Sequence, residues 1–196
     1  MERAVLLTGI GGQGVQLAAQ VLALAALDEG RDVQLFGSYG GMMRGGNTDA
    51  TVVLSDDRVT SPPTVGAAWA ALVLHHEYAA TTLSRIRPGG VVVRNTSVWE
   101  GAFDATGRTV VDVAATELAQ QAGNAIAAAM VMLGALSSAT GMASLAALQA
   151  AARQAVPAYR TQHVELNARA LDVGAGAVAS VMADAWPERA AARSGP

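Results

Sequence analysis

The chain has 196 residues, of which 52% are hydrophobic and 15% are charged, and its formal net charge at pH 7 is −3. This composition predicts a folded domain with a hydrophobic core and disfavours nucleic acid as the main ligand, because nucleic-acid binding depends on clustered Lys and Arg. The chain has no cysteine, so it cannot carry a disulfide, a catalytic thiol or a thiolate-ligated iron–sulfur cluster of its own.

The first part of the chain predicts a βαβ unit. Ala4–Thr8 is a continuous apolar run, as expected for a strand buried on both faces. Apolar residues recur at helical spacing over Val15–Leu27, and Gly30 supplies the stop signal. Arg31–Phe36 predicts a second strand, which we expect to be joined to the first by a right-handed parallel crossover.

The rest of the chain continues the α/β pattern. Gly37–Asn47 holds five glycines in 11 residues and predicts an irregular loop. Further elements are expected as follows: strands at Thr48–Leu54, Ala70–His75, Val91–Asn95 and Thr109–Val113, a helix at Glu77–Ile86, and a turn at Pro88-Gly89-Gly90. From Ala114 onward the pattern is helical, in three segments with breaks near Gly123, Gly141 and Pro157.

These elements predict an α/β fold: a Rossmann-like three-layer domain with a mostly parallel sheet and an alanine-rich helical C-terminal part. We expect one domain over residues 1–186 and a disordered tail over 187–196. Alanine lets helices approach closely but buries little area per residue, so support from a partner subunit is expected.

Location and metal binding are also constrained by the sequence. No apolar run reaches the roughly 18 residues of a membrane span, and the N-terminus does not resemble a secretory signal, so we expect a cytoplasmic protein. The histidines are His75, His76 and His163, which offer little for a metal site. Because neighbouring residues of a strand point to opposite faces, His75 and His76 are expected to have a structural role rather than to share an ion.

The segment Gly9-Ile10-Gly11-Gly12-Gln13-Gly14 fits the pattern G-x-G-x-x-G between a predicted strand and a predicted helix. Binding of NAD or FAD also needs an acidic residue at the carboxyl end of the second strand, whereas Asp32 lies at the start of that strand. Two other interpretations stay open: a tight turn without a ligand, and a loop that meets a phosphate or a partner. Gln13 could hydrogen-bond a ligand or cap the helix.

Four short motifs follow one another along the chain. They are GIGGQG at Gly9–Gly14, Ser38-Tyr39-Gly40, Arg44-Gly45-Gly46, and Pro88-Gly89-Gly90 before the strand that ends in Asn95. In this order the chain resembles the gamma subunit, or gamma domain, of 2-oxoacid:ferredoxin oxidoreductases. The resemblance is close from Ala4 to Ser97 and continues more loosely through Met130–Leu136 and Glu165–Leu171.

The resemblance implies a role inside a larger enzyme. Members of this family oxidatively decarboxylate pyruvate, branched-chain 2-oxoacids, 2-oxoglutarate or indolepyruvate. They use thiamine diphosphate and Mg on alpha and beta subunits, iron–sulfur clusters on the beta and ferredoxin-like parts, and coenzyme A. The gamma domain packs against the thiamine-binding domains and helps to form the coenzyme A entrance. The chain is therefore expected to hold no cofactor and no catalytic residue by itself.

Candidate site residues follow from the loops and the resemblance. Those expected at a cofactor are Gly11, Gly12, Gln13, Gly14, Arg44 and Asn95; those expected to face a partner are Tyr39, Met42, Met43, Gly45 and Gly46. The planar fork of Arg44 suits a phosphate, although a loop arginine can also pair with a surface carboxylate. Asn95 ends a parallel strand, where open α/β sheets bind ligands, but asparagine also fits a turn there.

Two positions depart from the family pattern. Many relatives have a glutamate two residues before the arginine of the second loop, where this chain has Met42. Many also have an asparagine before the MVMLGAL-like stretch, where this chain reads Ala127-Ala128-Ala129. Asn124 lies one helical turn away, and no role is transferred to it. The 2-oxoacid, the electron acceptor and the use of coenzyme A stay open.

Overall fold

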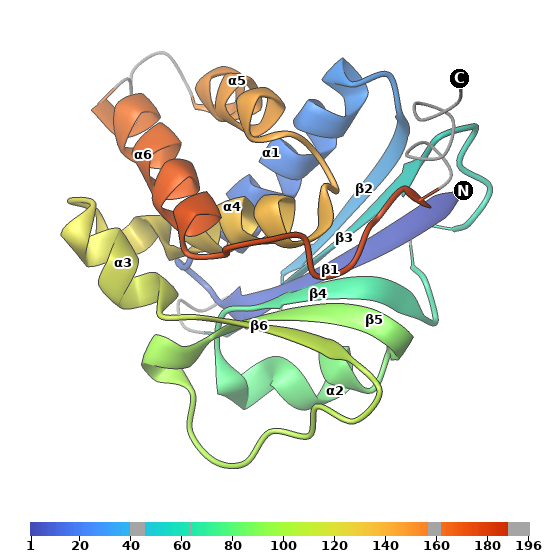
Figure 1. The fold of residues 1–196 in the computed structure, drawn as a ribbon, viewed down its shortest axis with the longest axis horizontal. Coiled ribbons are helices and arrows are strands. Elements are labelled where there is room, and N and C mark those ends of the chain that lie inside the picture. The colour runs from blue at the N-terminus through green and yellow to red at the C-terminus, as the bar shows by residue number, and fades with distance from the viewer. Residues whose placement is uncertain (40–45, 63, 157–161, 188–196) are drawn as a thin grey trace.

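The computed structural model describes residues 1–39, 46–62, 64–156 and 162–187. Its centre is a six-stranded sheet in the order β2-β3-β1-β4-β5-β6 (Figure 1). The strands are β1 Glu2–Ile10, β2 Asp32–Tyr39, β3 Asn47–Ser55, β4 Ala68–Val73, β5 Ile86–Asn95 and β6 Thr109–Val113. Strand β3 runs antiparallel to both of its neighbours, and the remaining pairs in the sheet are parallel.

Helices cover the two faces of the sheet unequally. They are α1 Val15–Asp28, α2 Ala79–Leu83, α3 Ala115–Gln121, α4 Ala128–Thr140, α5 Leu145–Ala155 and α6 Gln162–Gly176, with short 3-10 turns η1 His76–Tyr78, η2 Thr96–Val98 and η3 Ala125–Ala127. Figure 1 shows α1, α4, α5 and α6 on one side of the sheet and α2 on the other. The predicted α/β fold with a mostly parallel sheet is therefore confirmed.

The predicted parallel connection between the first two strands skips one strand of the sheet. Strands β1 and β2 are parallel, but β3 lies between them and pairs with both. The β1–β3 register runs from Glu2 opposite Ser55 to Ile10 opposite Asn47. Both ends of the predicted loop belong to strands, because β2 extends to Tyr39 and pairs with β3, which begins at Asn47. The β-branched stretch of β3 is thus buried between β1 and β2, a position that the sequence analysis left open.

Two further boundaries differ from the prediction. The predicted strand Ala70–His75 ends at Val73, and the predicted helix after it is the 3-10 turn η1 followed by the short helix α2. Strand β5 begins at Ile86 and runs through the predicted turn, with Gly89 in the left-handed region at φ 75° and a register shift against β4. The described C-terminal part holds four α-helices rather than three segments. Two breaks are as predicted, since α3 ends just before Gly123 and α4 ends at Gly141, and both glycines are in the left-handed conformation.

The core lies on both faces of the sheet, and helix α4 is buried on nearly every side between the sheet and α6. Two glycines set the distance between these helices. A Cβ atom on Gly174 of α6 would lie 1.8 Å from the carbonyl oxygen of Val131, and one on Gly134 of α4 would lie 2.1 Å from the carbonyl oxygen of Leu171. The helices therefore touch backbone to backbone, which is the close approach that the small residues of this region predict.

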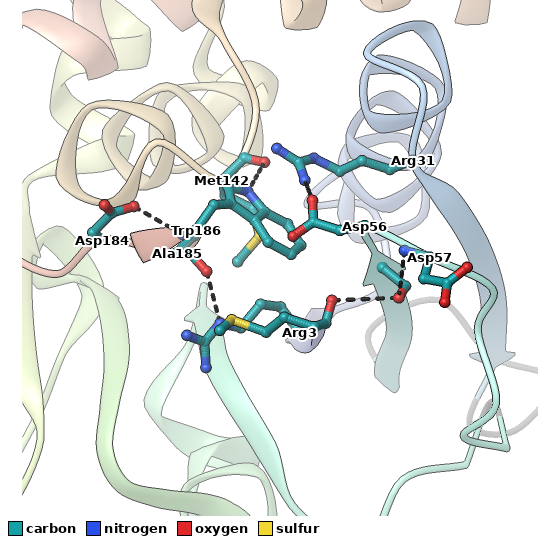
Figure 2. A network of polar contacts seen from close by, with 10 residues as sticks. Arg3, Arg31, Asp56, Asp57, Met142, Asp184, Ala185 and Trp186 are labelled. Atoms are coloured by element: carbon teal, nitrogen blue, oxygen red, sulfur yellow. Dashed lines mark hydrogen bonds and ion pairs between the residues drawn. The ribbon is translucent and has the colours of Figure 1, made fainter. Parts of the chain in front are cut away.

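The segment after α6 runs back to the amino ends of β1 and β2, where polar contacts hold it (Figure 2). The carbonyl oxygen of Ala185 accepts a hydrogen bond of 2.8 Å from Arg3 Nε, and the indole N–H of Trp186 donates to the carbonyl oxygen of Met142 at 3.1 Å. The guanidinium of Arg31 lies 3.7 Å from the centre of the Trp186 ring and pairs with the carboxylate of Asp56. This arrangement holds the C-terminal segment to the starts of β1 and β2.

The predicted tail lies almost wholly outside the described residues, which end at position 187, so its disorder stays a prediction. Within the described ranges, none of the helices combines the length and the hydropathy needed to cross a membrane.

The Glu2 carboxylate fixes the segment that follows β3. It accepts hydrogen bonds from the Thr60 N–H at 2.7 Å, from the Thr60 hydroxyl at 2.8 Å and from the Ser61 hydroxyl. These bonds, with that from the Ser61 hydroxyl the most important, lower the pKa of Glu2 from 4.5 to about 2. Because the pKa is lower in the folded state, the stabilisation is complete above pH 4.5 and is lost as the pH falls toward 2.

We therefore expect Glu2→Gln to lower the melting temperature at pH 6 and to leave it unchanged near pH 2. The carboxylate is partly exposed, so screening by solvent limits the effect to less than about 1 kcal/mol. Circular dichroism melts of both proteins across this pH range check the prediction. An equal difference at both ends of the range would contradict it.

Candidate functional site

The first glycine-rich loop connects the carboxyl end of β1 to helix α1. Gln13 closes the turn of this loop with two hydrogen bonds to Ile10. The side-chain Oε1 of Gln13 accepts from the Ile10 N–H at 2.7 Å, and the backbone N–H of Gln13 donates to the Ile10 carbonyl oxygen at 3.0 Å. Gln13 thus fixes the end of β1 and does not cap the helix. Its side-chain oxygen also leaves no room for a Cβ on Gly9, which would lie 2.7 Å from it.

The start of α1 is open to an anion. Gly12 and Gly14 have φ values of 106° and 84°, which only glycine adopts easily, and Gly14 is the N-cap residue of the helix. The first turn of α1 has no side-chain cap and no acidic residue. Free amides and the positive end of the helix dipole favour a negative group at such a terminus.

The two glycine-rich loops meet at this end of the sheet. The N–H of Gly11 donates a 2.9 Å hydrogen bond to the carbonyl oxygen of Gly46, just before β3. The other predicted residues of the second loop, which are Met42, Met43, Arg44 and Gly45, lie outside the described residues, as does the side chain of Tyr39. The structure therefore brings together Gly46 and the predicted residues of the first loop.

A polar residue that sequence reasoning missed lies beside this loop. Asp49 of β3 accepts hydrogen bonds from the hydroxyl of Thr8 at 2.6 Å and from the side-chain amide of Asn47 at 2.7 Å. The side chain of Gln16 donates to the Asp49 carbonyl oxygen at 2.8 Å, which ties α1 to β3. Asn47 Oδ1 is buried and has no hydrogen-bond partner among the described residues. The only signal in the sequence is a carboxylate within a β-branched strand that follows a glycine-rich loop.

The geometry for a dinucleotide is lacking in the described part of the chain. In such a site, the second strand of the βαβ unit lies beside the first and parallel to it, and carries an acidic residue at its carboxyl end. Strand β2 is separated from β1 by β3, and Asp32 lies at its amino end, where its carboxylate accepts hydrogen bonds from the N–H groups of Val59 and Val33. Asp32 therefore lies at the end of the sheet opposite to the glycine-rich loop, where it holds the segment that follows β3.

Asn95 is fully buried at the carboxyl end of β5. Its side-chain amide donates to the carbonyl oxygen of Leu74 at 3.2 Å and to the hydroxyl of Thr116 at 3.0 Å, and its oxygen accepts from the N–H groups of Ala115 at 3.1 Å and Ser97 at 3.3 Å. A ligand could use this side chain only if one of these bonds broke. Its position thus joins β4, β5 and α3.

We expect Asn95→Ala to destabilise the protein by about 2–3 kcal/mol, because buried amide and carbonyl groups would lose their partners. Asn124→Ala serves as the control, since that side chain accepts one hydrogen bond at the surface, from the Ile126 N–H. Its loss is expected to cost about 1 kcal/mol. Urea unfolding of the two variants measures both values; equal values would show that Asn95 does not join the three elements.

The histidine pair differs from its predicted arrangement. Since β4 ends at Val73, His75 and His76 lie beyond the strand, and their rings stack with centroids 4.6 Å apart instead of pointing to opposite faces. His76 Nδ1 lies 2.8 Å from the carbonyl oxygen of Val98. Among the residues that the structure describes, no group of three His, Cys, Asp or Glu side chains is placed to hold a metal ion.

Together these features define an open α/β domain whose two glycine-rich loops meet at the carboxyl end of a central strand. Residues 4–177 match the model of the pyruvate ferredoxin/flavodoxin oxidoreductase family, and the chain belongs to this family. The resemblance predicted from the ordered motifs is thereby confirmed.

Individual relatives agree with this assignment. The chain is 32% identical over 164 residues to the 2-oxoglutarate synthase subunit KorC of Methanothermobacter marburgensis, with 80% of this chain and 88% of KorC covered. It is 31% identical over 177 residues to the ketoisovalerate oxidoreductase subunit VorA of Methanothermobacter thermautotrophicus, with 89% of this chain covered. The match spans only 36% of VorA.

A solved structure shares both fold and sequence with the chain. It is the gamma subunit of a keto/oxoacid ferredoxin oxidoreductase from Geobacter sulfurreducens, which superposes with a TM-score of 0.72 at 28% identity. The match covers 89% of this chain and 97% of that subunit.

Proposed function

We propose that the chain is the gamma-type subunit of a thiamine-diphosphate-dependent 2-oxoacid:acceptor oxidoreductase, which oxidatively decarboxylates a 2-oxoacid. The observation that carries the proposal is the match along 97% of a gamma subunit, together with the hydrogen bond from the first glycine-rich loop to Gly46. The expected partners are alpha and beta subunits that hold thiamine diphosphate and Mg, and a ferredoxin-like subunit or acceptor with iron–sulfur clusters. The expected location of the complex is the cytoplasm.

Within such a complex the two loops would form a shared contact surface. The amides of Gly11, Gly12, Gln13 and Gly14 and the guanidinium of Arg44 would meet an anionic ligand such as coenzyme A or the substrate on its way in. Tyr39, Met42, Met43, Gly45 and Gly46 would face the partner. The hydrogen bond from Gly11 to Gly46 supports this role, because it joins the first loop to the start of β3 at the carboxyl end of β1. The uncapped start of α1 is compatible with a phosphate.

The role of Arg44 distinguishes this proposal from that of a purely structural scaffold subunit. In the assembled complex, we expect Arg44→Ala to lower kcat/KM for coenzyme A or the 2-oxoacid at least tenfold, because a charge-assisted contact is lost. Arg87→Ala, at an exposed position of β5, is the matched control and is expected to leave kcat/KM unchanged. Equal activity of the two variants would favour a scaffold that does not contact the ligand.

A further inference from the structure

Asp49 is a half-buried carboxylate on β3, next to the carboxyl end of β1. It lies directly opposite Thr8 in the register of the two strands, and its Oδ1 accepts a hydrogen bond of 2.6 Å from the Thr8 hydroxyl. Thr8 is fully buried and directly precedes Gly9, where the glycine-rich motif begins. One oxygen of the carboxylate therefore ties the root of the first loop to β3.

The other carboxylate oxygen of Asp49 holds the start of β3. Its Oδ2 accepts a hydrogen bond of 2.7 Å from the side-chain amide of Asn47, the first residue of the strand. Within the described ranges this is the one hydrogen bond made by the Asn47 side chain, because its Oδ1 has no partner there. Asn47 follows Gly46, whose carbonyl oxygen accepts from the Gly11 N–H at 2.9 Å. The carboxylate thus fixes the residue next to the carbonyl group that binds the first loop.

The backbone of Asp49 holds the start of helix α1. Its carbonyl oxygen accepts a hydrogen bond of 2.8 Å from Nε2 of Gln16, the second residue of the helix. The Oε1 atom of the same side chain lies against Gly37 of β2, where it leaves no room for a Cβ atom. The root of the loop, the residue after Gly46 and the first turn of α1 are therefore all attached to Asp49.

The chemistry of the carboxylate suits this place. A carboxylate only accepts hydrogen bonds, so its two oxygens can serve the Thr8 hydroxyl and the Asn47 amide at the same time. Its negative charge strengthens both bonds. The ion pairs found among the described residues involve Asp56, Glu100 and Asp112, and not Asp49. The contacts of Asp49 are thus with the groups that shape the loop.

We propose that Asp49 is a positioning residue of the subunit. It holds the first loop and the start of β3 in the arrangement in which the amides of Gly11–Gly14 meet the anionic ligand, and it does not contact that ligand. This role rests on the proposed function. A surface built from backbone amides depends on the residues that fix the backbone, because no side-chain rotation can correct its geometry. Loss of Asp49 would therefore weaken ligand binding and spare the chemistry, which takes place on other subunits.

The first test is steady-state kinetics of the assembled complex. We expect Asp49→Ala to raise KM for coenzyme A or for the 2-oxoacid by about fivefold or more, as for the loss of a hydrogen bond. The value of kcat should stay within about twofold, because ground-state binding is what is lost. Asp49→Asn should keep KM near the original value, since its oxygen can accept from Asn47 while its NH2 group donates to the Thr8 hydroxyl oxygen.

Asp32→Ala is the control for general destabilisation. It also removes a carboxylate of the sheet that accepts two hydrogen bonds, from the N–H groups of Val33 and Val59, but at the end away from the loop. Its KM values should equal those of the original chain. Unchanged KM values in Asp49→Ala, an equal rise in Asp32→Ala, or an Asp49→Asn variant as impaired as Asp49→Ala would overturn the proposal.

The second test uses the free chain, so that it does not depend on the proposed function. Amide hydrogen exchange measured by NMR reports the Gly11 N–H, which its bond to Gly46 protects. We expect this amide to exchange about tenfold faster or more in Asp49→Ala than in Asp32→Ala. An inactive complex of the original chain would refute the proposed function, whereas equal Gly11 exchange in the two variants would overturn the role of Asp49. If Asp49→Ala does not fold, Asn47→Ala replaces it in both tests, because it removes one of the two side-chain contacts.

Discussion

Replacing Gly174 with alanine is expected to destabilise the protein by about 3 kcal/mol, at the upper end of the usual cost of overpacking a core. The added Cβ would lie 1.8 Å from the carbonyl oxygen of Val131. Because the clash is with backbone, no side-chain rotation relieves it, and α6 must move away from α4. That movement would open the helical side of the core, where α4 is buried between α6 and the sheet.

Gly176→Ala is the matched control at the end of the same helix. Nothing lies within 4 Å of its Cβ position, so the substitution is expected to be neutral or to stabilise the protein by up to about 1 kcal/mol through helix propensity. Urea unfolding gives both free energies. A loss for Gly174→Ala no larger than that for Gly176→Ala would show that the two helices are not in backbone contact.

The second large effect is expected at the C-terminal segment. Trp186→Ala should cost about 3–5 kcal/mol, the range observed for the truncation of large aromatic side chains in cores. The ring is only 5% exposed and packs under the guanidinium of Arg31. Its loss would leave the Arg31–Asp56 pair open to water and free the segment that Figure 2 shows fastened to the sheet.

Trp186→Phe separates the ring from its hydrogen bond. It keeps an aromatic face for Arg31 but removes the indole N–H that donates to the Met142 carbonyl, so the expected cost is about 1 kcal/mol. Thermal and urea unfolding of the two variants are the measurements. If Trp186→Ala cost no more than Trp186→Phe, the segment would not be packed as described.

Much of the sheet could be predicted from the sequence, because buried parallel strands give continuous apolar runs. The strands around Val5, Val92 and Val111 were found in this way. The position of β3 could not be predicted, since its β-branched stretch fits an edge or a central position equally well. The central position of β3 follows only from its pairing with both β1 and β2. The role of Asp49 was missed for the same reason, because its contact with Thr8 depends on the pairing of β3 with β1.

The candidate site also has features that the sequence predicted and features that it could not predict. The glycine pattern of the first loop predicted a tight turn between strand and helix, and in the structure Gly12 and Gly14 of this turn have positive φ values. The contact of that loop with Gly46 joins parts of the chain far apart in sequence, which no local pattern indicates. The interaction of Trp186 with Arg31 also depends on long-range packing. Such contacts leave no periodic signal in the sequence.

The central claim is that this chain works as one subunit of a larger thiamine-dependent oxidoreductase. The most direct measurement is to express the candidate alpha and beta thiamine-binding subunits with and without the tagged chain, and to assay 2-oxoacid-dependent reduction of an acceptor. We expect the larger subunits to co-purify with the chain in stoichiometric amounts, full activity only when it is present, and no activity of the chain alone. A fully active complex that lacks the chain, or a chain that purifies without a larger partner, would contradict the claim.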